Sequence, residues 1–548
     1  MYMNQKSYFH GQSHHPLLGE TIGENLRNTC NKYSGREALI STEQDYRATY
    51  SEFWQEVTKV AKALLAVNLQ KGDRVGIWSP NRYEWVLMQY ATARAGVILV
   101  NINPAYRISE LVYALSQSSV SVLFSALSFK GSDYKAMIEE ASGLCENLRE
   151  VIFFDKDWQH FLSKSNNISD EELEKVENSI QFDDPVNIQY TSGTTGFPKG
   201  VTLSHYNLLN NGYFIGQRLG YTEEDKVCIP VPFYHCFGMV IGNLCCTSHG
   251  VCMVIPSESF DPLKVLKAVE IERCTSLYGV PTMFIAELQL PEFSQFDLSS
   301  LRTGVMAGSP CPVEVMKKVQ SLMHMKDVQI CYGMTETSPV STQTSGGTPF
   351  EKQVGTVGTV QDHLEIKIID PETGALQDRN TPGELCTRGY SVMLGYWNNA
   401  KATAEAIDQA RWMHTGDLAT MDDEGYLNIV GRIKDMILRG GENIYPREIE
   451  EFLYTHEAIT DVQVIGVPSE KYGEEVMAWV KIKTDRDVSV DDLIEFCSKQ
   501  IAHYKIPKYW KFVDGFPMTV TGKIRKVEMR ETSIEELNLQ EIAKIRTS

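Results

Sequence analysis

The chain has 548 residues, more than a single hydrophobic core usually supports, so two or more domains are predicted. Hydrophobic residues make up 43% and charged residues 22%, which excludes a wholly disordered, collagen-like or coiled-coil protein. Lysine and arginine number 52 against 71 acidic residues, and the resulting net charge of −19 argues against nucleic acid and anionic lipid surfaces as partners.

Short apolar runs alternate with helical patterns along the first part of the chain. Strands are predicted at 75–78, 97–100, 120–124 and 151–154, and helices at 51–67 and 83–95. Runs that are apolar on both faces suit parallel strands covered by helices. The sequence therefore predicts an α/β fold.

The pattern changes after residue 431, where charged and apolar residues alternate before two glycines that favour a linker. The remaining chain has the elements of a small unit, with helices at 446–455 and 490–501 and strands at 462–467, 476–483 and 511–513. We therefore predict a large domain over residues 1–433 and a small α+β domain over 434–548.

Three features predict where the protein is found. The 12 cysteines are scattered, with no paired CxxC spacing that would bind zinc, which favours free thiols in a reducing compartment. The first 20 residues lack the apolar core of a secretory signal and the arginines of a transit peptide, so we expect a cytoplasmic protein. The most apolar stretches, 85–102 and 240–256, contain polar residues, so no transmembrane segment is predicted.

The strand pattern at 187–191 runs into a segment rich in hydroxyl groups and glycines, with a single lysine. The segment from Tyr190 to Gly200 reads YTSGTTGFPKG. Glycines let backbone N–H groups approach an anion, the hydroxyls add donors, and Lys199 supplies positive charge. Gly200 stands where a Walker A loop has Ser or Thr, so this is a different phosphate loop.

The segment from Tyr190 to Gly200 resembles the signature of the adenylate-forming superfamily, which includes acyl-CoA synthetases, aryl-CoA ligases, luciferases and peptide-synthetase adenylation domains. Other motifs follow in that family's order, and the resemblance extends from about Glu37 to Arg530. The finer likeness is to the medium-chain acyl-CoA synthetase branch, and it is carried by the runs 187–196, 278–284, 382–397 and 434–446. This resemblance implies a large multi-sheet N-terminal domain and a small mobile C-terminal domain.

The resemblance also implies a nucleotide site. In the family's pattern Tyr332 stacks on adenine, Thr335 meets the α-phosphate, and Glu336 holds Mg²⁺, a hard cation that prefers carboxylate oxygen. Thr195 and Glu336 are implied as catalytic residues. The residues implied to bind ATP and AMP are Thr191, Ser192, Gly193, Thr194, Lys199, Gly308, Ser309, Tyr332, Gly333, Thr335, Asp417 and Arg432.

The C-terminal motif TGKIRK matches the family's catalytic-lysine loop and singles out Lys523. An ammonium group here would stabilise the charge that builds up when a carboxylate attacks the α-phosphorus of ATP. Lys434 is the implied hinge of the small domain, whose rotation would withdraw Lys523 before thiolysis by coenzyme A. The residues implied to contact coenzyme A are Gly440, Gly441 and Glu442, with Lys505 and Lys508 as further candidates for its phosphates.

Three segments resemble the walls of the family's acyl site, at 232–239, 278–283 and 303–307. None contains a carboxylate or a lysine, so a charged substrate tail would be buried without a partner. Gly333 stands where acetate-activating relatives place tryptophan, which favours chains longer than propionate. The predicted acyl-binding residues are His235, Phe237, Gly238, Tyr278, Thr282, Gly304 and Gly333.

Together these motifs predict a ligase that uses ATP, Mg²⁺ and coenzyme A to activate a fatty acid, with a medium-chain acid favoured. The products would be acyl-CoA, AMP and pyrophosphate. Three alternatives stay open: an aryl acid:CoA ligase, an acyl-AMP ligase that loads a carrier protein, and an inactive nucleotide-dependent sensor. The resemblance also implies a homodimer.

Overall fold

The chain forms two units in the computed structural model, which describes residues 5–191, 198–309, 311–439, 442–484, 486–498, 500–519 and 523–545. The large unit consists of Phe9–Ile366 and Thr387–His414. The small unit consists of Met1–Tyr8, Lys367–Cys386 and Thr415–Ser548. The boundary predicted between residues 433 and 434 stays a prediction.

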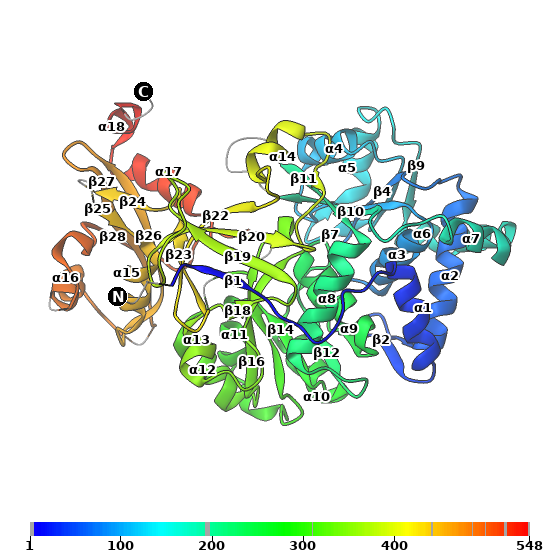
Figure 1. The fold of residues 1–548 in the computed structure, drawn as a ribbon, viewed down its shortest axis with the longest axis horizontal. Coiled ribbons are helices and arrows are strands. Elements are labelled where there is room, and N and C mark those ends of the chain that lie inside the picture. The colour runs from blue at the N-terminus through cyan, green and yellow to red at the C-terminus, as the bar shows by residue number, and fades with distance from the viewer. Residues whose placement is uncertain are drawn as a thin grey trace. The chain divides into compact units, whose positions relative to one another are not determined.

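A seven-stranded sheet forms one half of the large unit (Figure 1). Its strands, in order across the sheet, are β21 (Gly395–Tyr396), β11 (Lys199–Ser204), β10 (Pro185–Thr191), β5 (Ile98–Asn101), β4 (Arg74–Trp78), β6 (Val122–Ser125) and β9 (Glu150–Phe153). The strands from β10 to β9 are parallel, whereas β11 runs antiparallel to β10. The four strands predicted from apolar runs are therefore neighbours in one parallel sheet.

The second sheet of the large unit has nine strands. In order they are β18 (Thr359–Val360), β17 (Val340–Gln343), β16 (Asp327–Gly333), β15 (Thr303–Ala307), β14 (Ser276–Gly279), β12 (Lys226–Cys228), β13 (Cys252–Ile255), β2 (Glu37–Ser41) and β3 (Tyr46–Thr49). The pairs β14 with β15 and β15 with β16 are parallel, so the carboxyl ends of these three strands lie at one edge of the sheet.

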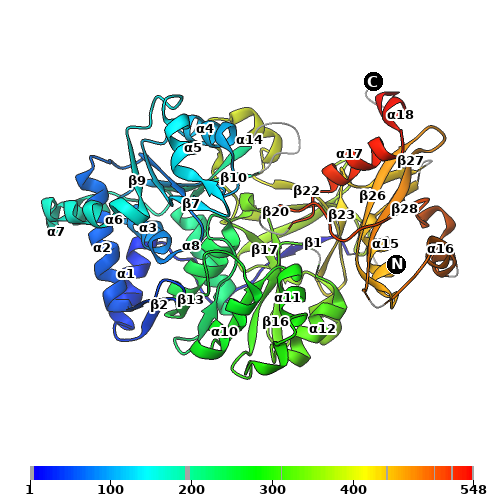
Figure 2. The ribbon, with the colours of Figure 1, turned by 180° about the vertical axis from the view of Figure 1, so that it is seen from behind.

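Helices cover both sheets. They are α1 (Ile22–Lys32), α2 (Tyr50–Ala66), α3 (Tyr83–Arg94), α4 (Ile108–Gln117), α5 (Tyr134–Ser142), α6 (Phe154–Ser163), α7 (Asp170–Glu177), α8 (His205–Leu219), α9 (Cys245–His249), α10 (Pro262–Glu272), α11 (Pro281–Leu288), α12 (Val313–Leu322), α13 (Phe350–Gly355) and α14 (Ala400–Ala406). In Figure 2, α10, α11 and α12 lie in a row over the nine-stranded sheet. Helix α8 follows β11 directly and also packs on β17, where Asn211 bonds both backbone groups of Val340.

The small unit contains two sheets. The first has the order β1 (Tyr8–His10), β19 (Leu364–Ile369), β20 (Gly383–Gly389), β22 (Met413–Met421) and β23 (Leu427–Arg432), and the ends of β1, β19, β20 and β22 continue into the large unit. The second contains β25 (Glu442–Ile444), β24 (Ile437–Arg439), β27 (Gly473–Ile482), β26 (Ile459–Ser469) and β28 (Tyr509–Phe512). Its helices are α15 (Pro446–Tyr454), α16 (Val490–Ser498), α17 (Lys526–Glu536) and α18 (Gln540–Ile545).

These elements confirm the predicted α/β class, with several sheets and a small C-terminal α+β portion. The 12 cysteines are all buried and free, as predicted from their spacing. Among the residues that the structure describes, no helix is both long enough and apolar enough to cross a membrane.

One buried carboxyl group in the large unit predicts how the folding stability depends on pH. Glu287 in α11 is 1% exposed, and its Oε2 accepts no hydrogen bond within the described residues. Burial raises the pKa of this carboxyl well above its ordinary value of 4.5. The folded state therefore binds a proton that the unfolded chain has released, and stability falls as the pH rises above 4.5.

We expect Glu287→Gln to remove this pH-dependent cost. Relative to the unaltered protein, the free energy of unfolding of the variant should rise little at pH 5 and more at pH 8. The rise is up to about 1.4 kcal/mol for each pH unit between the unfolded and the folded pKa of Glu287. Urea unfolding at both pH values measures the difference, with the exposed Glu139→Gln as the control. An equal effect of Glu287→Gln at pH 5 and pH 8 would contradict the buried, protonated carboxyl.

Candidate active site

The predicted nucleotide residues of the large unit lie where neighbouring strands end. Tyr332 and Gly333 are the last residues of β16, and Thr335 and Glu336 follow in a short 3₁₀ turn, Thr335–Thr337. Gly308 follows β15 directly and has φ +91°, a conformation that glycine adopts without strain. Because β15 and β16 are parallel neighbours, these segments leave the sheet at one edge, which is where α/β proteins bind ligands.

The phosphate loop connects two strands of the seven-stranded sheet. Thr191 ends β10 and pairs with Lys199, the first residue of β11. The implied residues Ser192, Gly193, Thr194 and Thr195 lie outside the described residues. The hairpin therefore fixes both ends of the loop.

Tyr396 brings the phosphate-loop lysine and the predicted metal ligand together. Its hydroxyl donates a hydrogen bond to Oε1 of Glu336 at 2.9 Å, and the Nζ atom of Lys199 lies 5.0 Å from the centre of its ring. Glu336 is 6% exposed. Sequence reasoning missed Tyr396, although it lies in the run 382–397 that carries part of the family likeness.

The predicted acyl-site segments meet in part. Phe237 begins a π-helix, Phe237–Leu244, and its ring lies 6.0 Å from the ring of Tyr278 in β14. The hydroxyl of Tyr278 accepts a hydrogen bond from the hydroxyl of Tyr221 at 2.8 Å. His235 is half-buried, and its Nδ1 accepts a hydrogen bond from the backbone N–H of Phe237. Thr282 lies in the first turn of α11, just after β14.

Three glycines of the predicted acyl site are also required by close packing of the backbone. A Cβ atom at Gly333 would lie 1.8 Å from the carbonyl oxygen of Pro339, and one at Gly304 would lie 2.1 Å from that of Leu277. At Gly238 the carbonyl oxygen of Pro232 would be 2.5 Å away. The absence of a tryptophan at 333 therefore has a backbone cause besides the open pocket predicted from sequence.

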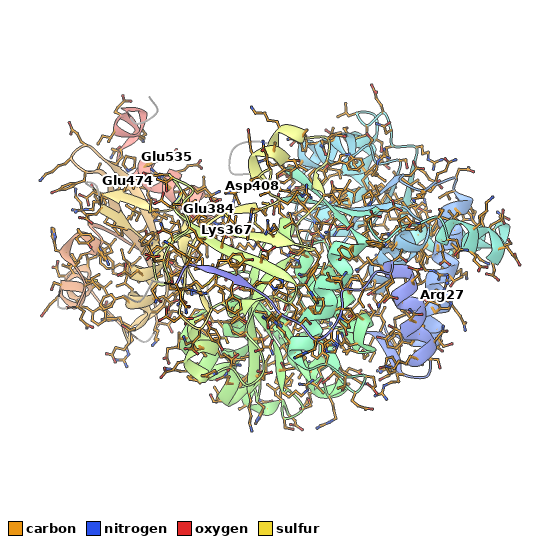
Figure 3. The ribbon with its side chains drawn as sticks, viewed as in Figure 1. Arg27, Lys367, Glu384, Asp408, Glu474 and Glu535 are labelled. Carbon is orange, nitrogen blue, oxygen red and sulfur yellow. The ribbon has the colours of Figure 1, made fainter. Side chains whose placement is uncertain are left out.

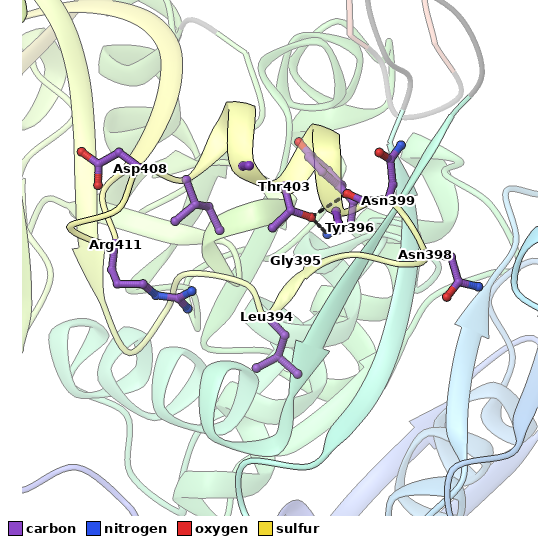
Figure 4. Close-up of a pocket in the computed structure, with 11 residues that line it drawn as sticks. Leu394, Gly395, Tyr396, Asn398, Asn399, Thr403, Asp408 and Arg411 are labelled. Atoms are coloured by element: carbon purple, nitrogen blue, oxygen red, sulfur yellow. Dashed lines mark hydrogen bonds between the residues drawn. The ribbon is translucent and has the colours of Figure 1, made fainter.

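A cavity of about 490 Å³ lies beside Tyr396 in the large unit (Figure 4). The lining residues are Leu394, Gly395, Tyr396, Asn398, Asn399, Ala400, Thr403, Ala404, Ile407, Asp408 and Arg411. The predicted acyl-binding residues are not among them. The cavity therefore exposes one side of Tyr396 and leaves the acyl site to other segments.

In the small unit, the two residues implied to contact ribose are paired across a hairpin. Asp417 in β22 is the register partner of Arg432 in β23, and Nε of Arg432 donates to Oδ1 of Asp417 at 3.1 Å. Lys434, the implied hinge, is exposed in the turn that follows β23. Strand pairing thus joins two predicted residues that lie 15 positions apart.

The backbone of Lys523 is hydrogen-bonded to Thr519. Its N–H donates to Oγ1 of Thr519, and its carbonyl accepts from the N–H of Thr519 at 2.7 Å. Three residues later, Nζ of Lys526 bonds Oε1 of Glu450 and the carbonyl of Val464. The backbone of Lys523 and the side chain of Lys526 are therefore both held by hydrogen bonds.

Residues proposed for coenzyme A fall into two groups. Gly440 and Gly441 lie outside the described residues, and Glu442 is exposed at the start of β25. Lys505 pairs with Glu448, and Lys508 lies 3.7 Å from Glu475. Both lysines thus have a carboxylate partner, and an incoming phosphate would compete with it.

Carboxylates also hold the strands of the small unit together. Glu474, labelled in Figure 3, is 4% exposed and accepts hydrogen bonds from Arg530 and from the N–H of Leu438. Glu475 accepts from Arg439, whose guanidinium lies over the ring of Tyr472. These buried pairs fix β24 and α17 on β27.

Comparison with known proteins places these residues in a family. The model of the AMP-binding enzyme matches residues 26–397, and that of the AMP-binding enzyme C-terminal domain matches residues 448–523. YngI of Bacillus subtilis, which its name assigns to the acyl-CoA synthetases, is 47% identical over 95% of this chain and 99% of its own. The mitochondrial medium-chain acyl-CoA ligase ACSF2 of Danio rerio is 43% identical over 97% of this chain and 91% of its own.

Solved structures of similar proteins agree with this assignment. ATP-bound MatB from Rhodopseudomonas palustris has a TM-score of 0.81 at 27% identity and covers 94% of this chain and 99% of its own. The anthranilate CoA ligase AuaEII with anthranoyl-AMP has a TM-score of 0.82 at 25% identity and covers 94% of this chain and 98% of its own. The family match spans most of the chain, and the chain belongs to the AMP-binding enzyme family.

Proposed function

We propose that this protein is an AMP-forming acyl-CoA ligase that activates a medium-chain fatty acid. The observation that carries the proposal is that Lys199 and Glu336 both contact Tyr396. Lys199 begins the strand after the phosphate loop, and Glu336 lies in the turn after β16. A cationic and an anionic side chain placed there suit a bound triphosphate and its counter-ion. The relatives named as medium-chain acyl-CoA ligases support the substrate class.

In the first half-reaction, a carboxylate oxygen of the fatty acid attacks the α-phosphorus of ATP, and pyrophosphate leaves. The phosphate loop with Lys199 binds the phosphates, Tyr332 stacks on the adenine, and Asp417 and Arg432 hold the ribose. Tyr332 is half-buried at the end of β16, which supports a stacking role. Thr335 is 7% exposed beside it and would bond the α-phosphate.

Glu336 fits a Mg²⁺ ligand. Its carboxylate is 6% exposed, and Tyr396 occupies its Oε1, so the hard oxygen donor is held in a defined direction. Bound Mg²⁺ would neutralise negative charge on the phosphates and so favour departure of pyrophosphate. The chain's own part is to hold the carboxylate in place.

In the second half-reaction, the thiol of coenzyme A attacks the acyl carbon, and AMP leaves with the electrons of the broken bond. We propose that Lys523 serves the first half-reaction only, because its ammonium stabilises charge that develops on the carboxylate and phosphate oxygens. The hinge at Lys434 would then move Lys523 away. Gly440, Gly441 and Glu442 would flank the thiol arm.

An apolar acid fits the acyl segments. The segment 232–239 buries the side chains of Phe233, Cys236 and Met239. The ring of Phe237, in the same segment, packs near the ring of Tyr278. A second carboxylate or an ammonium on the substrate would find no charged partner in these segments and would pay its desolvation cost. This supports a fatty acid over an amino acid or a diacid.

Acyl-CoA formation across a panel of acids tests the proposal. We expect the highest kcat/KM for straight chains of about eight carbons, with AMP and pyrophosphate formed in equal amounts. Release of ADP instead of AMP would contradict the mechanism. Higher kcat/KM for benzoate or cinnamate would favour the aryl alternative, transfer to a free carrier protein but not to coenzyme A would favour the acyl-AMP ligase, and ATP binding without turnover would favour the sensor.

Location and assembly stay predictions. A cytoplasmic location is proposed from the sequence, whereas the relative from Danio rerio is named as mitochondrial. Fractionation of the source cells would separate the two. A homodimer is proposed from the family resemblance, and light scattering of the purified protein would measure the mass in solution.

A further inference from the structure

The backbone of Tyr396 is held in place by hydrogen bonds to two neighbouring elements. In β21 it pairs with Val201 of β11, and its N–H donates to Oγ1 of Thr403 in α14 at 2.9 Å (Figure 4). The next residue, Trp397, donates its N–H to the carbonyl of Gly200 at 2.7 Å. Hydrogen bonds to α14 and to the strand that follows the phosphate loop therefore fix the backbone position from which the Tyr396 side chain extends.

The hydroxyl of Tyr396 contacts Glu336, in the turn that follows β16 of the nine-stranded sheet. It donates to Oε1 of Glu336 at 2.9 Å, and the N–H of Met393 donates to the backbone carbonyl of Glu336 at 2.9 Å. The segment around β21 therefore holds Glu336 at both its backbone and its carboxylate.

The ring of Tyr396 contacts the phosphate loop. The Nζ atom of Lys199 lies 5.0 Å from the ring centre, within the range of a cation–π interaction. Lys199 also pairs with Thr191 through the backbone, so its side chain extends from a fixed strand toward Tyr396. The Tyr396 side chain thus contacts a cationic group from β11 and an anionic group from the turn that follows β16.

We propose that Tyr396 is a positioning residue that couples the metal ligand Glu336 to the phosphate-loop lysine Lys199. The inference rests on the proposed function, since it assigns Glu336 to Mg²⁺ and Lys199 to phosphate. With Oε1 fixed by the tyrosine, the remaining oxygen of Glu336 has a set direction, and Mg²⁺ tolerates little departure from octahedral geometry. Hydrogen-bond partners of ligating carboxylates commonly change metal affinity by about 10–100-fold.

Two substitutions separate the two contacts. Tyr396→Phe removes the hydroxyl and keeps the ring, so it should affect the carboxylate alone. Tyr396→Leu removes both, so it should also release Lys199. Tyr50→Phe is the matched control, because Tyr50 is a buried tyrosine of the same unit whose hydroxyl donates one hydrogen bond to the carbonyl of Val251 at 2.8 Å.

The measurement is calorimetric binding of a non-hydrolysable ATP analogue to the full chain, without metal and across a Mg²⁺ series. Mg²⁺ tightens nucleotide binding, and the Mg²⁺ concentration that gives half of this effect is the quantity compared. We expect Tyr396→Phe to raise that concentration by about tenfold or more and to leave metal-free nucleotide binding unchanged. Tyr396→Leu should also weaken metal-free binding. In a Glu336→Gln background, Tyr396→Phe should add no further change to the Mg²⁺ dependence.

The outcomes distinguish the coupling from the function on which it rests. If the unaltered protein binds nucleotide with Mg²⁺ dependence and Tyr396→Phe matches it, the coupling is wrong and the function stands. Equal weakening by Tyr396→Phe with and without metal would also overturn the coupling, since a merely structural role predicts it. If the unaltered protein binds no nucleotide under any condition, the proposed function is wrong and the coupling falls with it.

Discussion

Replacing Lys523 by alanine should lower the rate of acyl-adenylate formation by about 10²–10³-fold, the usual effect of losing one group that stabilises developing charge. The same variant should convert a supplied acyl adenylate and coenzyme A to acyl-CoA at nearly the rate of the unaltered protein. The reason is that the first half-reaction builds up negative charge on the carboxylate and phosphate oxygens during attack at phosphorus, whereas in the second the thiol attacks the acyl carbon and AMP leaves.

The described contacts around Lys523 test whether this substitution disturbs the fold. The backbone of Lys523 makes two hydrogen bonds with Thr519, and Lys526 anchors the following helix to Glu450. These contacts of Lys523 use its backbone, which alanine keeps, and the melting temperature of Lys523→Ala measures whether the small unit stays folded.

Pyrophosphate exchange into ATP measures the first half-reaction, and a stopped assay with synthetic acyl adenylate measures the second. Lys471→Ala, an exposed lysine of the same unit, is the control and should leave both rates unchanged. Equal loss of both half-reactions in Lys523→Ala would refute its assigned role and would point to a general disturbance of the small unit.

Much of the fold could be predicted because its signals are local. Apolar runs gave β4, β5, β6 and β9 to within about two residues at each end, since a strand buried on both faces leaves a continuous apolar stretch. The clustering of nucleotide motifs at strand ends was also predictable, because the carboxyl ends of parallel strands meet at one edge. The pairing of Asp417 with Arg432 follows from the hairpin that joins β22 and β23.

The Tyr396 contact could not be predicted, because it joins a strand residue to a residue of the turn after β16, 60 positions away in the sequence. No periodicity links β21 to the turn at Glu336, and a tyrosine between a glycine and a tryptophan gives no sign of what its hydroxyl meets. Only the folded arrangement of β21 beside the turn Thr335–Thr337 brings them together. The signal available in the sequence was the family likeness of the run 382–397, which marked the region but not the residue.

Gly333 shows a second limit of prediction from sequence. The family resemblance explains this glycine by an open acyl pocket, and the structure adds a cause in the packing of the backbone. A Cβ atom there would lie 1.8 Å from the carbonyl oxygen of Pro339 and 3.1 Å from the N atom of Ser341. Both are backbone atoms of β17 or of the residue before it, which cannot rotate away as a side chain could. Gly333 is therefore required where β16 and β17 approach each other.

We expect Gly333→Ala to destabilise the large unit by about 3 kcal/mol, the upper end of the usual range for overpacking, because strand β17 must shift. A role in pocket volume alone predicts normal stability and a modest preference for shorter acids, since one methyl group fills little of an acyl site. Chemical unfolding followed by tryptophan fluorescence measures the stability, and the acid panel measures the preference. Gly143→Ala is the matched control, because its Cβ would have no atom within 4 Å and its φ is −68°. If Gly333→Ala unfolds at the same denaturant concentration as Gly143→Ala, the close approach of β16 and β17 does not constrain this position, and the pocket alone explains the glycine.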